Sequence, residues 1–150
     1  PPARSAGRRA TRSRSVPGCV TAAPRETAGR CAGDARRGVD TPVANASGSG
    51  GAFLVAGWSI DRDSGAGPGI DALHIWAYPV GGGAPRFLGI AAYGAARGDI
   101  ATMFGARFLN AGFSLLATGV PPGVYDVVAF PHSAVSGTFA SGKVVRLDVK

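Results

Sequence analysis

The sequence predicts an all-β fold for residues 51–150, an antiparallel β-sandwich of about seven strands with one short helical turn. Short apolar segments recur there at regular intervals, separated by Gly, Pro and Asp, which is typical of all-β proteins. No segment is long enough to form the helix that must cross between two parallel strands. We therefore expect antiparallel sheets in two facing layers.

Six segments have the composition of strands, and glycine-rich turns separate the first three of them. The expected strands are 52–60, 70–79, 86–93, 112–119, 123–130 and 143–150. Between the third and the fourth, residues 96–108 place apolar side chains at helical intervals. This spacing predicts one or two helical turns, with Asp99 near the N-cap.

Residues 1–50 differ from the rest in composition. They contain no Phe, Trp, Tyr, Leu, Ile or Met, and they hold nine arginines against three acidic residues. Such a stretch cannot bury enough apolar surface to offset an ordering cost of about 1–2 kcal/mol per residue. We predict a disordered basic tail with a formal charge of +6, whereas residues 51–150 carry only +1. No window approaches the ~18 apolar residues of a membrane span, so none is expected.

Both cysteines, Cys19 and Cys31, lie in this predicted tail. No histidine or second cysteine pair accompanies them, so they do not match a zinc site. A local disulfide and two free thiols both stay open. The predicted sandwich has no cysteine and must therefore be stable by its core alone.

A tyrosine stands just inside the predicted strand 123–130, directly after a Pro-Pro-Gly turn. This is the context of a tyrosine corner, in which the Tyr125 ring lies in the core and its hydroxyl bonds back to the upstream chain. The alternative is an ordinary buried tyrosine at a strand start. We favour the corner.

Residues 55–149 carry a spaced set of residues that is fairly specific as a whole. It consists of Gly57-Trp58, Asp61, Ile70-Asp71, Tyr93-Gly94, Asp99, Phe104, Gly112-Phe113-Ser114 and Gly123-x-Tyr125. On this pattern the chain resembles an immunoglobulin-like (fibronectin III-like) repeat of secreted and cell-surface bacterial proteins, and more loosely a repeat module of streptococcal cell-wall-associated proteins. The resemblance implies a non-catalytic extracellular module, often fused to other domains.

The predicted strand 70–79 is apolar on both faces. Alternate residues from Leu73 to Ala77 point one way, and those from His74 to Tyr78 point the other. In an immunoglobulin-type sandwich this strand pairs with 123–130. Its outer face would then be a contact surface for a ligand or partner, because contiguous apolar patches usually mark interaction sites. The candidate contact residues are His74, Trp76, Tyr78, Phe130 and His132.

One alternative to this interpretation stays open. The strand could be inverted, so that Trp76 is the buried tryptophan common in this fold.

The expected function is a structural spacer or an adhesion and protein-interaction unit of a secreted or cell-surface bacterial protein, with neighbouring domains or other proteins as partners. The alternative function is a carbohydrate-binding module, because flat rings such as Trp76, Tyr78 and Phe130 suit stacking on sugars.

An enzyme is not expected, and no catalytic residue is proposed. Residues 51–150 contain no Glu, no Cys and only two histidines. Ser133, His132 and Asp126 can be assembled into a triad on paper, but no G-x-S-x-G motif accompanies them.

The loop 61–71 holds the best candidate for a metal site. Asp61, Asp63 and Asp71, with glycines between them, could supply oxygen ligands to Ca²⁺. The alternative is an inter-strand loop in which Asp caps turns and Gly supplies positive φ. No other cofactor is expected.

Two further motifs carry little weight. Arg97-Gly98-Asp99 spells an integrin-binding tripeptide, but it overlaps the predicted helical turn, where Asp is suited to capping. The arginines of residues 1–50 could attract phosphates. Because no aromatic residues for base stacking accompany them, no nucleic-acid partner is expected.

Overall fold

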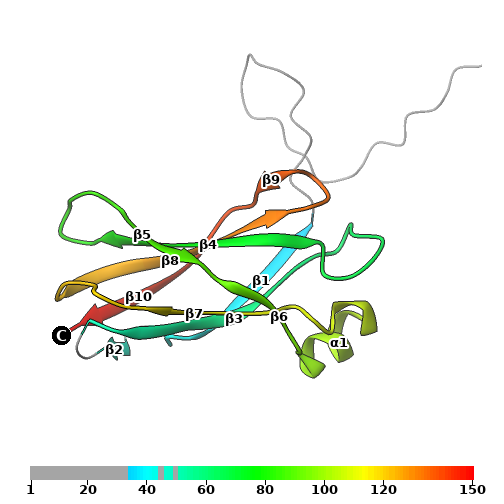
Figure 1. Ribbon diagram of the computed structural model, residues 1–150, viewed down its shortest axis with the longest axis horizontal. Coiled ribbons are helices and arrows are strands. Elements are labelled where there is room, and N and C mark those ends of the chain that lie inside the picture. The colour runs from blue at the N-terminus through cyan, green and yellow to red at the C-terminus, as the bar shows by residue number, and fades with distance from the viewer. Residues whose placement is uncertain (1–33, 44–45, 49–50) are drawn as a thin grey trace, which may run out of the picture. The chain divides into compact units, whose positions relative to one another are not determined.

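The computed structural model describes residues 34–43, 46–48 and 51–150. Its strands are β1 (Ala35–Thr41), β2 (Ala46–Gly48), β3 (Phe53–Asp61), β4 (Ile70–Pro79), β5 (Arg86–Ile90), β6 (Ala92–Ala95), β7 (Gly112–Ala117), β8 (Gly123–Ser133), β9 (Thr138–Phe139) and β10 (Lys143–Val149). They form two facing sheets (Figure 1). Sheet A has the order β1-β3-β7-β6, and sheet B has the order β2-β10-β8-β4-β5, with β9 paired to β8.

This strand order is that of an immunoglobulin-type sandwich. β1, β3, β7 and β6 take the places of strands A, B, E and D, and β4, β8 and β10 take those of C, F and G. The pairs are antiparallel, except that the short β2 runs parallel to β10. The predicted all-β, immunoglobulin-like sandwich is therefore confirmed, including β8 between β4 and β10.

The prediction of a disordered tail up to residue 50 is wrong for residues 35–41 and 46–48. β1 pairs with β3, with Gly38 opposite Trp58, and Val39 packs against the core. A Cβ on Gly38 would lie 2.6 Å from the indole nitrogen of Trp58, so the absence of a side chain lets this strand approach. The prediction from composition did not find β1, because a strand that pairs through its backbone with the edge strand β3 needs few large apolar side chains. Residues 1–33, with Cys19 and Cys31, lie outside the described residues.

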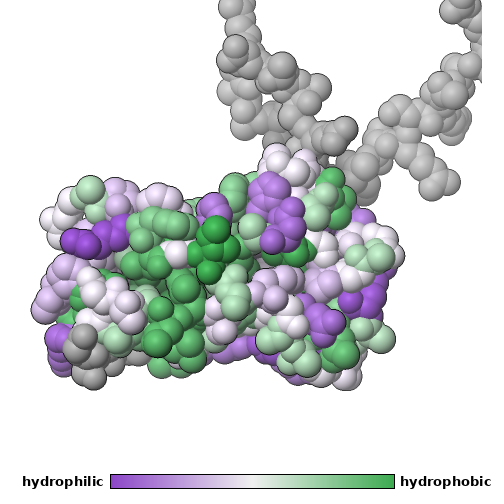
Figure 2. Space-filling view, in the orientation of Figure 1, coloured by the Kyte–Doolittle hydropathy of each residue, from purple (hydrophilic) through white to green (hydrophobic). Residues whose placement is uncertain are grey.

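The predicted strand 86–93 is divided between the two sheets. β5 pairs with β4 in sheet B, whereas β6 pairs with β7 in sheet A. Gly89, with φ of 142°, adjoins the irregular register of β5, and a Cβ there would lie 3.3 Å from Leu115 of the opposite sheet. Figure 2 shows hydrophobic residues gathered where Figure 1 places β5 and β7. The chain thus passes from sheet B to sheet A between β5 and β6.

The helical turn forms as predicted, as α1 (Gly98–Phe104) followed by the 3₁₀ turn η1 (Ala106–Phe108). Asp99 is not its N-cap, which is Arg97 without a side-chain capping bond. Asp99 lies in the first turn, where a carboxylate still favours the helix dipole. The two turns close a second, small core against sheet A, built from Ile60, Ile100, Phe108 and Ala111 with Trp58 and Phe104 against it. Among the described residues, no helix has the length and hydropathy of a membrane span.

The main core lies between the two sheets. Its buried members are Phe53, Val55, Leu73, Ile75, Ala77, Ala91, Phe113, Ala117, Val120, Tyr125, Val127, Ala129, Leu147 and Val149. Leu73 and Ile75 are at most 1% exposed, and full burial of such a side chain stabilises the fold by about 1.5–3 kcal/mol. The tyrosine corner is confirmed, because the buried Tyr125 donates its hydroxyl hydrogen to the Pro121 carbonyl at 3.1 Å.

Candidate functional site

β4 exposes its second set of side chains on the outer face of sheet B. Leu73 and Ile75 lie in the core, so His74 and Trp76, which alternate with them, lie outside it. Trp76 is half-buried by neighbours on that outer face. The alternative in which Trp76 is the buried core tryptophan is therefore wrong.

The register of β4 and β8 brings the sequence-predicted residues together. His74 lies opposite Phe130, and Ala72 lies opposite His132. Tyr78 lies on the same face, 37% exposed. The five residues predicted as a contact surface thus share one face of the sheet, while their role in binding stays a prediction.

Two phenylalanines that the sequence analysis did not single out complete this surface. Phe87 of β5 lies opposite Trp76, and Phe139 of β9 lies opposite His132. Ring centroids are 5.0 Å apart for Trp76–Phe87, 5.4 Å for Phe87–His74, 4.6 Å for His74–Phe139 and 4.8 Å for Phe139–His132. These five residues form a continuous line that we name the aromatic row.

The two phenylalanines are the most exposed rings of the aromatic row. Phe87 is 49% exposed and Phe139 is 47% exposed. Alternation in the segment Arg86–Ile90 could have placed Phe87 beside Trp76. Nothing in the sequence signalled Phe139, because β9 has only two residues and owes its position to pairing with the end of β8.

Phe130 is less available than the sequence analysis expected. A Cβ on Gly142 would collide with Val128 and lie 2.9 Å from the Phe130 ring. The backbone that leads into β10 therefore lies directly on these two side chains. The Phe130 ring therefore packs against the backbone at Gly142 and does not offer an open face to a ligand.

Charged residues lie at one end of the aromatic row and farther along the same face of sheet B. His132 Nδ1 lies 2.6 Å from Asp71 Oδ1 at one end. On β8 and β10, the Arg146 guanidinium donates two hydrogen bonds to Asp126, of 2.8 and 2.9 Å. These bonds lower the pKa of Asp126 and raise the pKa of Arg146. Asp148 follows on the same face of β10, opposite the exposed Val124.

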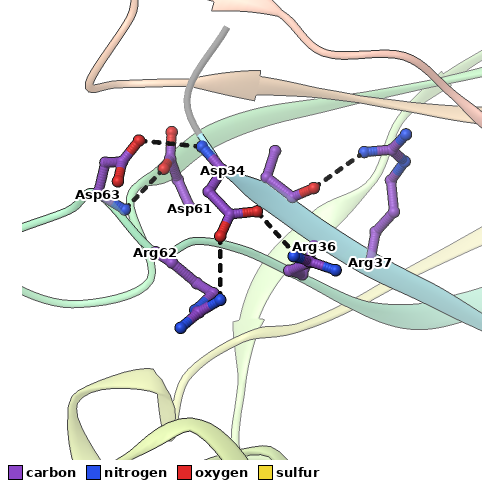
Figure 3. Close-up of polar contacts among 7 residues, drawn as sticks. Asp34, Arg36, Arg37, Asp61, Arg62 and Asp63 are labelled. Atoms are coloured by element: carbon purple, nitrogen blue, oxygen red, sulfur yellow. Dashed lines mark hydrogen bonds and ion pairs between the residues drawn. The ribbon is translucent and has the colours of Figure 1, made fainter. Parts of the chain in front are cut away.

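The predicted calcium site does not form. Asp61 is fully buried, where it accepts hydrogen bonds from the Ser133 hydroxyl and the Asp63 N–H. Asp63 in turn accepts the Asp34 N–H at 3.0 Å, as Figure 3 shows, while Asp71 pairs with a histidine. The three carboxylates thus serve separate partners. The described part of the chain holds no group of three His, Cys, Asp or Glu residues that could bind a metal ion.

The triad assembled on paper does not converge either. Ser133 is 1% exposed, and its Oγ donates to Asp61 while accepting the N–H groups of Val135 and Ser136. His132 points to the opposite face of β8 and pairs with Asp71. Asp126 belongs to the ion pair with Arg146.

The two charged residues of the integrin-like tripeptide, Arg97 and Asp99, bind each other. Arg97 donates two hydrogen bonds to Asp99, of 2.9 and 2.6 Å, and a third to Asp40 of β1. The guanidinium holds the pKa of Asp99 at about 2, and the two carboxylates raise the pKa of Arg97. The two charged ends of the tripeptide therefore neutralise each other, and the contact fastens β1 to the start of α1.

No protein-family model matches the chain, nor does any curated protein. Among solved structures, the chain is similar to the fibronectin(III)-like modules of CbhA from Clostridium thermocellum, with 14% sequence identity and a TM-score of 0.45. The match covers 77% of this chain and 46% of the other, so it spans about half the length of the structure it matches. The assignment of the fold depends on the strand order described above and not on this loose likeness.

Proposed function

We propose that the sandwich is a non-enzymatic interaction module that docks to another protein through the aromatic row. One observation carries this proposal: two strands distant in sequence, β5 and β9, hold Phe87 and Phe139 half exposed on either side of His74. Contiguous apolar surface of this kind usually marks an interaction site. A spacer without a partner has no need of it.

The non-enzymatic part of the proposal is supported by how the chemically competent groups are used. The Ser133 hydroxyl is buried and hydrogen-bonded to a carboxylate, so no substrate can reach it. Arg97 and Arg146 are each held by aspartates. No convergent acid, base and nucleophile arise from these residues.

Carbohydrate binding is the less favoured function for the same surface. Sugars stack on a flat, open ring face, whereas Trp76 and Phe87 are tilted by 50° and His74 and Phe139 by 45°. Tilted rings interlock with the side chains of a protein surface more readily than they support a planar sugar face. A glycan array separates the two functions, because a hit that Trp76→Ala abolishes would favour carbohydrate.

We further propose that the module belongs to an exported or surface-bound bacterial protein, on the strength of the sequence resemblance alone. Intact producing cells treated with protease test this location. Cleavage of the module outside unbroken cells supports it. Protection until the cells are lysed would contradict it.

Site-specific crosslinking tests the docking role. A photoreactive phenylalanine at position 139 should capture a partner, whereas the same group at position 116, which is exposed on the outer face of sheet A, should not. The purified partner should then bind the chain in calorimetry, weakly to Phe139→Ser and normally to Leu116→Ser. Equal capture from both positions, or from neither, would contradict docking through the aromatic row and leave the spacer function.

A further inference from the structure

The aromatic row offers ring faces to its partner. The faces of Phe and Trp rings carry the negative end of a quadrupole, so they attract cations as well as apolar groups. Phe87 and Phe139 are about half exposed, and Trp76 lies beside the first of them. The row can therefore bind a positive charge at more than one point.

The ionisable groups on the same face also favour a positively charged partner. On the outer side of β8 and β10 lie Asp126, Arg146 and Asp148, and Asp71 lies beside His132 at the end of the row. Arg146 is the one cation in this set, and two hydrogen bonds already commit it to Asp126. Counted without the histidines, Asp71 and Asp148 leave these strands with two negative charges in excess, and one exposed cation, Lys150, directly follows β10.

The other cations of sheet B lie off this face. Lys143 pairs with Ala129, and Arg86 pairs with Ala77. Both alanines are buried on the inner side of the sheet. Because paired residues share a face, Lys143 and Arg86 lie on the inner side as well, and not on the face of the aromatic row. They do not offset the two aspartates.

We infer that the partner presents a cationic, arginine-bearing protein segment to the aromatic row. This inference rests on the proposed function and adds the chemistry of the partner. The planar guanidinium suits both surfaces, because it stacks on rings and bonds to carboxylates in a fork. The apolar stem of such an arginine would pack on the exposed ring of Phe87 or of Phe139.

The same charges argue against other occupants. Two copies meeting face to face would bring like charges together, which is unfavourable. An anionic partner, such as nucleic acid or an acidic protein surface, would face the carboxylates and the negative ring faces. A neutral segment would gain only from apolar contact.

Three labelled ten-residue peptides test the inference against the full chain by fluorescence anisotropy. One alternates Arg with Val, the second has neutral citrulline in place of Arg, and the third has Glu. The Arg peptide should bind about tenfold more tightly than the citrulline peptide, which a desolvated cation–π contact and a carboxylate together can supply. Its affinity should fall as salt rises.

Variants locate the binding. Phe139→Ser should weaken the Arg peptide about tenfold, and Asp148→Asn should weaken it about threefold. Phe139→Tyr should retain binding and Phe139→Leu should lose part of it, because leucine keeps apolar area without a ring. Leu116→Ser, on the other sheet, is the matched control and should bind like the parent. Circular dichroism confirms that each variant is folded.

The outcomes separate this inference from the proposed function. Because residues 1–50 hold nine arginines that attract acidic peptides, binding is scored only where Phe139→Ser weakens it. If the citrulline or Glu peptide binds through Phe139 as tightly as the Arg peptide, the row docks a partner but the inferred charge is wrong. If no peptide depends on Phe139, the inference is wrong, and crosslinking from position 139 then decides the proposed function separately.

Discussion

The Ser133 hydroxyl donates a hydrogen bond to the buried Asp61 carboxylate and so joins the end of β8 to the end of β3, 72 residues away. The contact ties sheet B to sheet A at one end of the sandwich. Asp61 also accepts the Asp63 N–H, and Asp63 accepts the Asp34 N–H, so the start of β1 belongs to the same network (Figure 3). Asp61, which resembled a metal ligand in the sequence, therefore joins the two sheets through its hydrogen bond with Ser133, a contact that we name the clamp.

Ser133→Ala should lower the free energy of unfolding by about 2–3 kcal/mol, because a bond to a buried charged group is lost and the carboxylate loses a partner. Urea denaturation measures this change. Ser136→Ala is the control, since its hydroxyl makes an exposed bond to Thr138, and it should change stability by less than about 0.5 kcal/mol. A Ser133→Ala variant as stable as the parent would contradict the clamp.

Tyr125→Phe should cost about 1 kcal/mol, because it removes the corner bond to Pro121 while the ring stays in the core. The loss is measured as a fall in the denaturation midpoint with an unchanged slope. Tyr78→Phe, on an exposed side chain, is the comparison and should leave the midpoint where it was. Equal effects of the two substitutions would show that the corner bond contributes nothing.

Gly38→Ala should destabilise the fold by about 1–3 kcal/mol, because the new methyl group would be forced against the Trp58 indole. Hydrogen exchange at the β3 amides that face β1 should rise first. Gly81→Ala, where a Cβ meets nothing within 4 Å, is the control. Unchanged exchange in Gly38→Ala would contradict the pairing of β1 with β3.

Acid should weaken the contact between Arg97 and Asp99. The pKa of Asp99 is held at about 2 in the folded chain, below the ~3.9 of an unfolded aspartate. Because the pKa of Asp99 is lower in the folded chain, its contact with Arg97 stabilises the fold at pH values above the pKa of the unfolded chain. This stabilisation is lost as the pH falls from about 4 to about 2. Asp99→Asn should therefore show a shallower loss of stability across this window, measured by urea denaturation at each pH. An identical pH profile in parent and variant would rule this contribution out.

The sequence alone determined the sandwich, the β4 alternation and the tyrosine corner. Each depends on local signals: period two in 70–79, a Pro-Pro-Gly turn before Tyr125, and strands too closely spaced for crossover helices. Three of the five members of the aromatic row, His74, Trp76 and His132, followed from the same signals, because alternation places them on the outer side of their strands.

Only the tertiary structure decided the rest. It assigned residues 35–41 to a strand, because an edge that offers hydrogen bonds can pair with a segment that lacks large apolar residues. It added Phe139 to the aromatic row and gave Asp61 to Ser133 instead of to a metal. These partners come from chain segments far apart in the sequence, and the register that brings them together is set by the packing of whole sheets, which no local pattern encodes.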